Sequence, residues 1–211
     1  MSVSISPAFD LVAQIKGKKN PEEVIIIGAH SDSWYNAAGA HDDGAGCVQI
    51  MDVLRIFNEL KIDNKRTIRV ILFMDEEINR AGAKAYADYF DNDKETIVAG
   101  IESDLGGYQP NGFLIDGTDP IINQIKAYKE YLLPYGIYNI DKGFGGMDIL
   151  TLKRKYGFPS IALRVESQRY FEIIHTVNDT FDKVYQRELQ LGTAAIASLV
   201  YLLDKYGIKQ D

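Results

Sequence analysis

The sequence is poor in several residue types, and each shortage excludes a class of protein. Cys47 is the only cysteine among 211 residues, which excludes an internal disulfide and argues against a cysteine-rich structural zinc site. No apolar run reaches the length of a membrane span. The N-terminus lacks the basic-then-apolar order of a signal peptide, and we assign no compartment from the sequence.

Positive charge is also in short supply. The chain has 23 Lys and Arg against 30 Asp and Glu, and its net charge of -7 argues against a nucleic-acid partner. Its 46% apolar and 25% charged residues are ordinary for a globular protein. Without an internal repeat or a low-complexity linker, residues 1–211 are predicted to form a single domain with one core.

Apolar patterns predict strands and helices that alternate along the chain. Residues 24–28 form a continuous, mostly β-branched run, which is typical of a strand buried on both faces. Residues 2–16 alternate in the manner of an edge strand or hairpin. Further strands are predicted at 67–74, 96–101, 113–115 and 159–165, and helices at 43–60, 82–90, 121–132, 147–156 and 189–205. This order predicts an α/β fold, a three-layer sandwich with a mostly parallel mixed central sheet and helices on both faces.

Acids and a histidine follow three of the predicted strands at the point where each strand ends. His30 and Asp32 follow the first strand, Glu76 and Glu77 the second, and Asp104 the third. Because ligands gather at the carboxyl ends of parallel strands, we expect these groups to converge. One such acid alone marks where a strand emerges into water, whereas three strand ends together indicate a site.

The first two motifs have the residue types that a metal site needs. His30 and Asp32 are two residues apart on an extended segment and face the same way, so Asp32 can orient a metal-binding His30. Asp42 stands in a Gly-rich turn before a predicted helix, where it can bridge two cations or, like Asp43, begin the helix. We expect His41 to be a bystander beside the site.

The later motifs add a base and a second imidazole. Adjacent Glu76 and Glu77 point in different directions, so one can bind metal while the other handles protons. His175 has Asp179 nearby as an orienting residue. Mixed nitrogen and oxygen ligands suit catalytic zinc better than magnesium or calcium.

Five motifs in this order resemble a known family. They are Gly-Ala-His-Ser-Asp-Ser-Trp at 28–34, Asp-Asp-Gly-Ala-Gly at 42–46, Asp-Glu-Glu at 75–77 followed by Gly82, Glu-Ser-Asp at 102–104, and His-Thr at 175–176 followed by Asp-Thr at 179–180. With them the chain resembles the co-catalytic di-zinc exopeptidases, especially the leucyl aminopeptidase and carboxypeptidase Q branches.

The resemblance implies two Zn²⁺ ions bridged by Asp42. On the family pattern, His30 and Asp104 bind one ion, and Glu77 and His175 bind the other. The implied partner is a short peptide, whose terminal bond the enzyme hydrolyses as an aminopeptidase or dipeptidase.

The resemblance also implies roles around the metals. Glu76 is the general base, Asp32 belongs to the catalytic set, and Asp32 and Asp179 orient the ligands. A cis peptide bond is expected between Asp42 and Asp43.

The chain also departs from the family pattern. Residues 78–80 replace glycines that often follow the Glu pair, and Ile174 stands where an aromatic often precedes the last ligand. The resemblance implies an N-terminal segment and an inserted protease-associated domain, neither of which we expect within residues 1–211, either as a minimal form or as a fragment. We therefore expect apolar surface that a partner or a second copy of the chain would cover.

Two other functions stay open at this point. A glutaminyl-cyclase-like acyltransferase has the same fold with one zinc, and a transferrin-receptor-like binding module has the scaffold without its ligands. The substrate-binding residues and the choice among aminopeptidase, carboxypeptidase and dipeptidase are not assigned.

Overall fold

The computed structural model describes residues 7–90 and 93–208, which contain one mixed sheet in the order β1-β3-β2-β4-β7-β5-β6. The strands are β1 (Leu11–Ile15), β2 (Asn20–His30), β3 (Arg66–Phe73), β4 (Thr96–Glu102), β5 (Pro110–Asp116), β6 (Asn139–Lys142) and β7 (Ser160–Val165). Strands β3, β2, β4 and β7 pair in parallel, whereas β1 is antiparallel to β3 and β5 to β7. The predicted, mostly parallel mixed sheet is confirmed.

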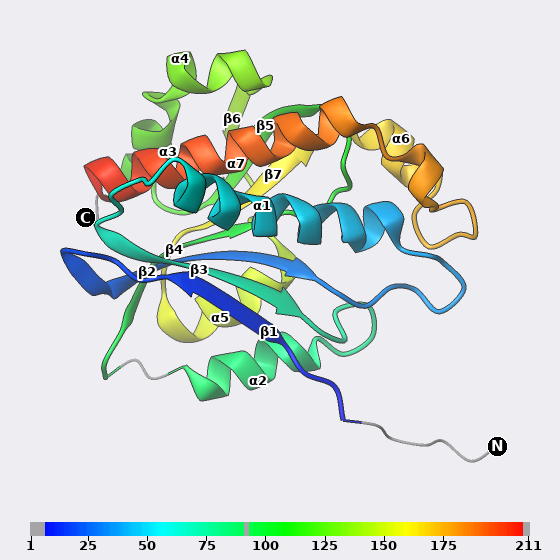
Figure 1. Cartoon of the computed structure of the whole chain (residues 1–211), viewed down its shortest axis with the longest axis horizontal. Coiled ribbons are helices and arrows are strands. Elements are labelled where there is room, and N and C mark those ends of the chain that lie inside the picture. Colours follow the sequence, from blue (N-terminus) through cyan, green and yellow to red (C-terminus); the bar gives the residue numbers. More distant parts are fainter. Residues whose placement is uncertain (1–6, 91–92, 209–211) are drawn as a thin grey trace.

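Helices cover both faces of this sheet. They are α1 (Ala45–Glu59), α2 (Ala81–Tyr89), α3 (Asp119–Lys126), α4 (Lys129–Leu132), α5 (Met147–Tyr156), α6 (Ser167–Phe171) and α7 (Gln186–Tyr206), with short helical turns η1 (Ala40–Gly44), η2 (Leu133–Tyr135) and η3 (Phe181–Lys183). Helices α1 and α7 lie on one face, and α2 and α5 on the other (Figure 1). The three-layer sandwich is therefore confirmed.

The apolar run of β2 explains why this strand lies at the centre. Val24 and Ile26 pack into the core beneath α2 and α5, and Ile25 and Ile27 pack into the core beneath α1 and α7. All four side chains are fully buried. A strand covered on both faces needs an unbroken apolar run, because neither set of alternating side chains meets water.

Some elements differ from the prediction. In the predicted strand or hairpin over 2–16, the structure has a strand only at β1, and residues 2–6 lie outside the described residues. The single helix predicted over 121–132 is divided into α3 and α4, with Tyr128 buried against Tyr206 at the break. Strand β6 and helix α6 were not predicted, because four or five residues are too short to establish a period.

Within the described ranges, no helix has both the length and the hydropathy required to cross a lipid bilayer.

We expect the core beneath α7 to dominate stability. Leu199→Ala removes a fully buried side chain and should lower the free energy of unfolding by about 2–5 kcal/mol, since the cavity adds to the lost transfer energy. The matched change Leu60→Ala, at a side chain that is 70% exposed, should cost less than about 0.5 kcal/mol. Denaturant titration of both variants checks this, and equal losses would contradict the packing described here.

Candidate active site

The carboxyl ends of the central parallel strands lie at one edge of the sheet. The arrowheads of β2, β3 and β4 point to this edge (Figure 1). His30 is the last residue of β2, Glu76 and Glu77 follow β3, and Asp104 follows β4. His30 Nε2 lies 3.3 Å from Asp104 Oδ1, so these strand ends bring their side chains together.

His30 presents one ring nitrogen to a group of carboxylates. Its Nδ1 donates to the backbone carbonyl oxygen of Asp32 at 3.1 Å, which leaves Nε2 facing Asp42 Oδ1 at 3.2 Å. Burial lowers the pKa of His30, but hydrogen bonds with Asp104, Asp32 and Asp42 outweigh burial and raise it. The surroundings of Nε2 therefore favour a positive charge, which either a proton or a metal ion can supply.

Asp42 lies between the two histidines. Its Oδ1 is 3.2 Å from His30 Nε2, and its Oδ2 is 3.1 Å from His175 Nε2. The residue belongs to η1, a turn preceded by Gly39 with a φ of 68°, and it is 4% exposed. Its peptide bond to Asp43 is cis, as the resemblance implied. A carboxylate with one oxygen toward each imidazole has the arrangement of a bridging ligand.

His175 approaches Asp42 from a loop on the other side of the site. Its Nε2 lies 2.9 Å from Glu77 Oε2, and its ring stacks on Trp34 at 4.6 Å between centroids. The residue has a φ of 59°, in the left-handed region. The stacking orients an imidazole whose side chain is 42% exposed.

Two groups of ligand atoms result from these contacts, and both fit a metal ion. One group contains His30, Asp43 and Asp104, the other contains Asp42, Glu77 and His175, and the ligand atoms of each group lie within 4.8 Å of one another. Among the described residues, Glu77 Oε1 is buried without a hydrogen-bond partner, and the polar atom paired with the buried Asp42 Oδ2 is His175 Nε2, at 3.1 Å without the geometry of a hydrogen bond. Buried carboxylate oxygens without donors are costly unless a cation binds them, so this set fits zinc.

Asp43 is the less suitable of the two adjacent aspartates as a ligand. Its Oδ2 accepts the backbone N–H of His30 at 3.1 Å, and its Oδ1 accepts that of Gly46 at 3.0 Å. Both oxygens therefore hold the backbone at the start of α1 against the end of β2. The oxygens of Asp42 face the imidazoles instead, which favours Asp42 as the shared ligand.

Asp32 and Asp179, the two orienting acids expected from the sequence, accept hydrogen bonds from backbone N–H groups. Asp32 accepts the N–H groups of Glu76 at 3.1 Å and Glu77 at 3.4 Å, and its Oδ1 lies 3.6 Å from His30 Nδ1. Asp179 was expected beside the ring of His175. Its carboxylate instead accepts the N–H groups of residues 41 and 42 at 2.7 and 3.0 Å. Asp179 therefore positions the turn that carries Asp42.

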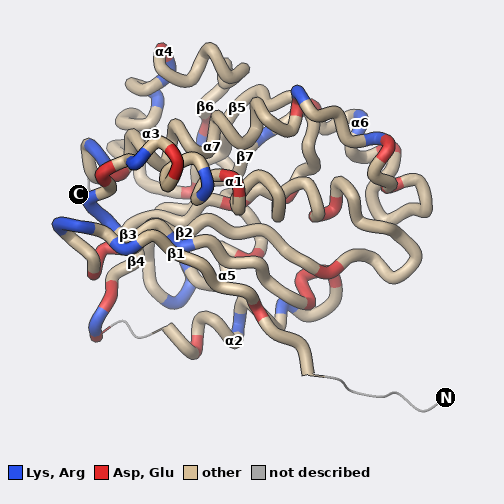
Figure 2. Tube along the Cα trace, viewed as in Figure 1, with Lys and Arg blue, Asp and Glu red and all other residues tan. Residues whose placement is uncertain are grey.

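Negative charge is concentrated at this edge. Figure 2 shows acidic positions on the loops that follow the central strands, away from the basic positions near the C-terminal end. Burial, with the neighbouring Asp104 carboxylate, raises the pKa of Glu76 to about 7. Burial, with Glu76, raises the pKa of Asp148 to about 8. Cations would relieve this crowding.

The sequence did not predict the positions that two acids, Glu102 and Asp148, take behind the site. Glu102 is buried at the end of β4 and accepts the N–H groups of Met147 at 2.5 Å and Ile149 at 2.7 Å, which fixes the start of α5. Asp148 is 1% exposed, and its Oδ1 has no hydrogen-bond partner among the described residues. The position of Glu102 at a strand end marked it as an acid of this edge, but no sequence pattern pairs it with α5.

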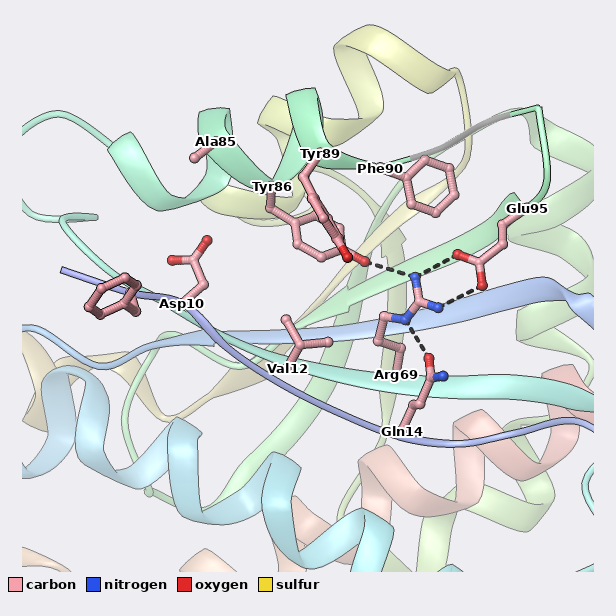
Figure 3. A pocket seen from close by; sticks show the side chains of 10 residues that line it. Asp10, Val12, Gln14, Arg69, Ala85, Tyr86, Tyr89, Phe90 and Glu95 are labelled. Atoms are coloured by element: carbon pink, nitrogen blue, oxygen red, sulfur yellow. Dashed lines mark hydrogen bonds and ion pairs between the residues drawn. The ribbon is translucent and has the colours of Figure 1, made fainter. Parts of the chain in front are cut away.

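A separate hollow of about 910 Å³ lies between β1 and α2. Figure 3 shows that Arg69 on its wall is already paired. The guanidinium donates to Glu95 at 2.7 and 2.8 Å, to Gln14 at 2.7 Å and to Tyr86 at 3.0 Å. None of the residues proposed here as metal ligands lines this hollow.

The chain is similar to known peptidases over nearly its whole length. Carboxypeptidase Q of Rattus norvegicus is 30% identical over 93% of this chain, which spans 41% of that protein. A crystal structure of a peptidase M28 precursor from Shewanella amazonensis has a TM-score of 0.85 at 28% identity, covering 95% of this chain and 46% of that one. A zinc aminopeptidase from Bacillus subtilis has a TM-score of 0.73 at 18% identity, covering 96% of this chain and 50% of that one. At that identity, the last match shows a likeness of fold.

The chain thus spans less than half the length of the rat protein. The model of one family, described as peptidase family M28, matches residues 10–200. Because this match covers almost all of the sequence, the chain belongs to peptidase family M28.

Proposed function

We propose that this chain is the catalytic domain of a two-zinc exopeptidase that hydrolyses the terminal peptide bond of short peptides. The proposal rests on the Asp42 carboxylate, whose Oδ1 lies 3.2 Å from His30 Nε2 and whose Oδ2 lies 3.1 Å from His175 Nε2. A second carboxylate lies beside each imidazole, Asp104 at 3.3 Å and Glu77 at 2.9 Å. Two equivalent half-sites around one shared acid support two ions.

His30, Asp42 and Asp104 would hold one zinc ion, and Asp42, Glu77 and His175 the other. When bound, two zinc ions polarise the scissile carbonyl and make a water molecule more acidic. The hydrogen bond from His30 Nδ1 to Asp32 fixes which nitrogen is left to bind metal.

Glu76 is the residue we propose as general base. Its backbone is held by Asp32, and neither of the two ligand groups includes its carboxylate. Such a carboxylate can take the proton of the attacking water and deliver it to the leaving amine. Without bound metal, burial beside Asp104 raises the pKa of Glu76 to about 7, and cations on the neighbouring carboxylates would lower it toward the ionised form that a general base needs.

Short peptides with a free terminus are the proposed substrates. This proposal is supported by the names of the relatives, a carboxypeptidase and a zinc aminopeptidase. The terminus that is recognised and the preferred side chain stay unassigned. Association with a partner or with a second copy of the chain, expected from the sequence, also stays a prediction.

Metal analysis tests the shared ligand. After saturation with zinc and removal of excess, we expect two zinc ions per chain, and less than one in Asp42→Asn, because both half-sites lose a ligand charge. Asp63→Asn makes the same chemical change at an exposed acid paired with Lys18 and should retain two ions.

Stoichiometry also separates the alternatives. One tightly bound zinc in the wild-type chain would favour the glutaminyl-cyclase-like function, and no zinc would favour a binding module. Either result would refute the two-zinc proposal.

The proposed base predicts a loss of turnover without a loss of metal. Glu76→Gln should retain two zinc ions while kcat falls by about 10²–10⁴-fold, since a glutamine cannot accept the water's proton. Glu59→Gln, at an exposed residue of α1, is the matched control with unchanged kcat. Wild-type turnover in Glu76→Gln would remove Glu76 from this role.

Peptides blocked at one end test the exopeptidase assignment. Unblocked dipeptides and tripeptides should be cleaved, and blocking the recognised terminus by N-acetylation or C-amidation should abolish cleavage. Mass spectrometry of the products identifies the bond that is broken. Internal cleavage of a peptide blocked at both ends would contradict the assignment.

A further inference from the structure

His41, expected to be a bystander, occupies a specific position beside the site. Its ring is fully buried, and its Nδ1 accepts the backbone N–H of Gly107 at 3.1 Å. Because Nδ1 accepts, the proton of the neutral ring is on Nε2. This hydrogen bond joins the turn that carries Asp42 to the loop that carries Asp104.

The same ring begins a stack of side chains. Tyr108 lies parallel to His41, with 4.1 Å between ring centroids and 7° between planes. The Arg169 guanidinium lies 4.5 Å from the Tyr108 ring centroid and donates to both carboxylate oxygens of Glu188 at 2.8 and 3.1 Å. The His41 stack, meaning His41, Tyr108, Arg169 and Glu188, thus runs from η1 to the first turn of α7.

The segments joined by this stack carry three of the four proposed ligands that lie outside strands. Asp42 follows His41, Asp104 precedes Gly107 in the same loop, and His175 lies between Arg169 and Glu188. His30 ends a strand of the sheet, so the hydrogen bonds of the ladder position its backbone. The backbone of Glu77, the fourth, is held by Asp32, whereas the other three require another device to keep their spacing.

The backbone at Gly106 shows how closely these groups pack. Gly106 has a φ of 80°, and a Cβ there would lie 3.0 Å from His41 Nδ1, 3.0 Å from Tyr170 and 3.2 Å from Tyr108. A glycine at this position lets the loop after Asp104 come close enough to His41 for the Gly107 N–H to reach Nδ1.

We propose that His41 is a positioning residue for the metal centre. Its Nδ1, by accepting the backbone N–H of Gly107, sets the spacing between Asp42 and Asp104. The inference rests on the proposed two-zinc function. It predicts that loss of the acceptor weakens zinc binding, whereas a change of ring packing alone affects mainly folding.

The test compares His41→Asn with His41→Leu. The two side chains have similar shapes and both remove the stacked ring, but only asparagine offers an oxygen near the position of Nδ1. We expect zinc affinity, measured by competition with a chromogenic chelator, to fall by about 10–100-fold in His41→Leu, because an outer partner of the ligands is lost. His41→Asn should restore most of this affinity. Turnover of a short peptide should follow, with kcat lower in His41→Leu and KM unchanged.

Circular dichroism and unfolding of the metal-free variants separate positioning from folding. Glu59→Gln, at an exposed residue of α1 outside the stack, is the control with unchanged zinc affinity. If His41→Leu does not fold, His41→Gln replaces it. The carbonyl oxygen of glutamine falls nearer the Nε2 position, so it does not replace Nδ1 as the acceptor of the Gly107 N–H. A folded His41→Leu that binds zinc as the wild type does, or a His41→Asn that is equally defective, would overturn the inference. A wild-type chain that does not bind two zinc ions would overturn both this inference and the proposed function.

Discussion

The position of one carboxylate, that of Asp42 between His30 and His175, determines how the rest of the site is arranged. A buried acid between two imidazoles, with further acids behind each, is stable only if positive charge accumulates there. A proton on the His30 ring can supply part of that charge, because the acids around this ring raise its pKa, and divalent cations bound in place of the proton supply more. The same requirement that makes the folded edge unfavourable for bare carboxylates makes it suitable for metal ions.

The site combines ligands of two mechanical kinds. His30 is the end of a central strand, and the backbone of Glu77, just beyond β3, is held by Asp32, so both have little freedom to move. Asp42 and His175 come from loops with a left-handed backbone. In the first loop the left-handed residue is Gly39, three residues before Asp42, and in the second it is His175 itself. Asp179, four residues beyond His175 in the same loop, holds the turn that carries Asp42. Ligands held at or just after strands, His30 and Glu77, therefore meet ligands held by loop contacts, Asp42 and His175, around the Asp42 carboxylate.

This difference between strand-end ligands and loop ligands explains which parts of the site the sequence could predict. The run of residues 24–28 predicted a central strand because burial on both faces leaves a local pattern. The convergence of His30 and Asp104 followed from the geometry of parallel strands. The contact of Asp179 with η1 joins residues 138 apart, and the contact of Glu102 with α5 joins residues 45 apart. Such pairings depend on tertiary packing, and no local pattern marks them. Strand β6 has a single buried residue, Ile140, and offers no alternation to detect.

Trp34 is the only tryptophan in the chain, and its indole lies flat against the imidazole of His175. An indole's emission is sensitive to charge on a ring stacked against it. All tryptophan fluorescence of this protein therefore originates beside one histidine, and the folded chain contains its own optical probe of what that imidazole binds.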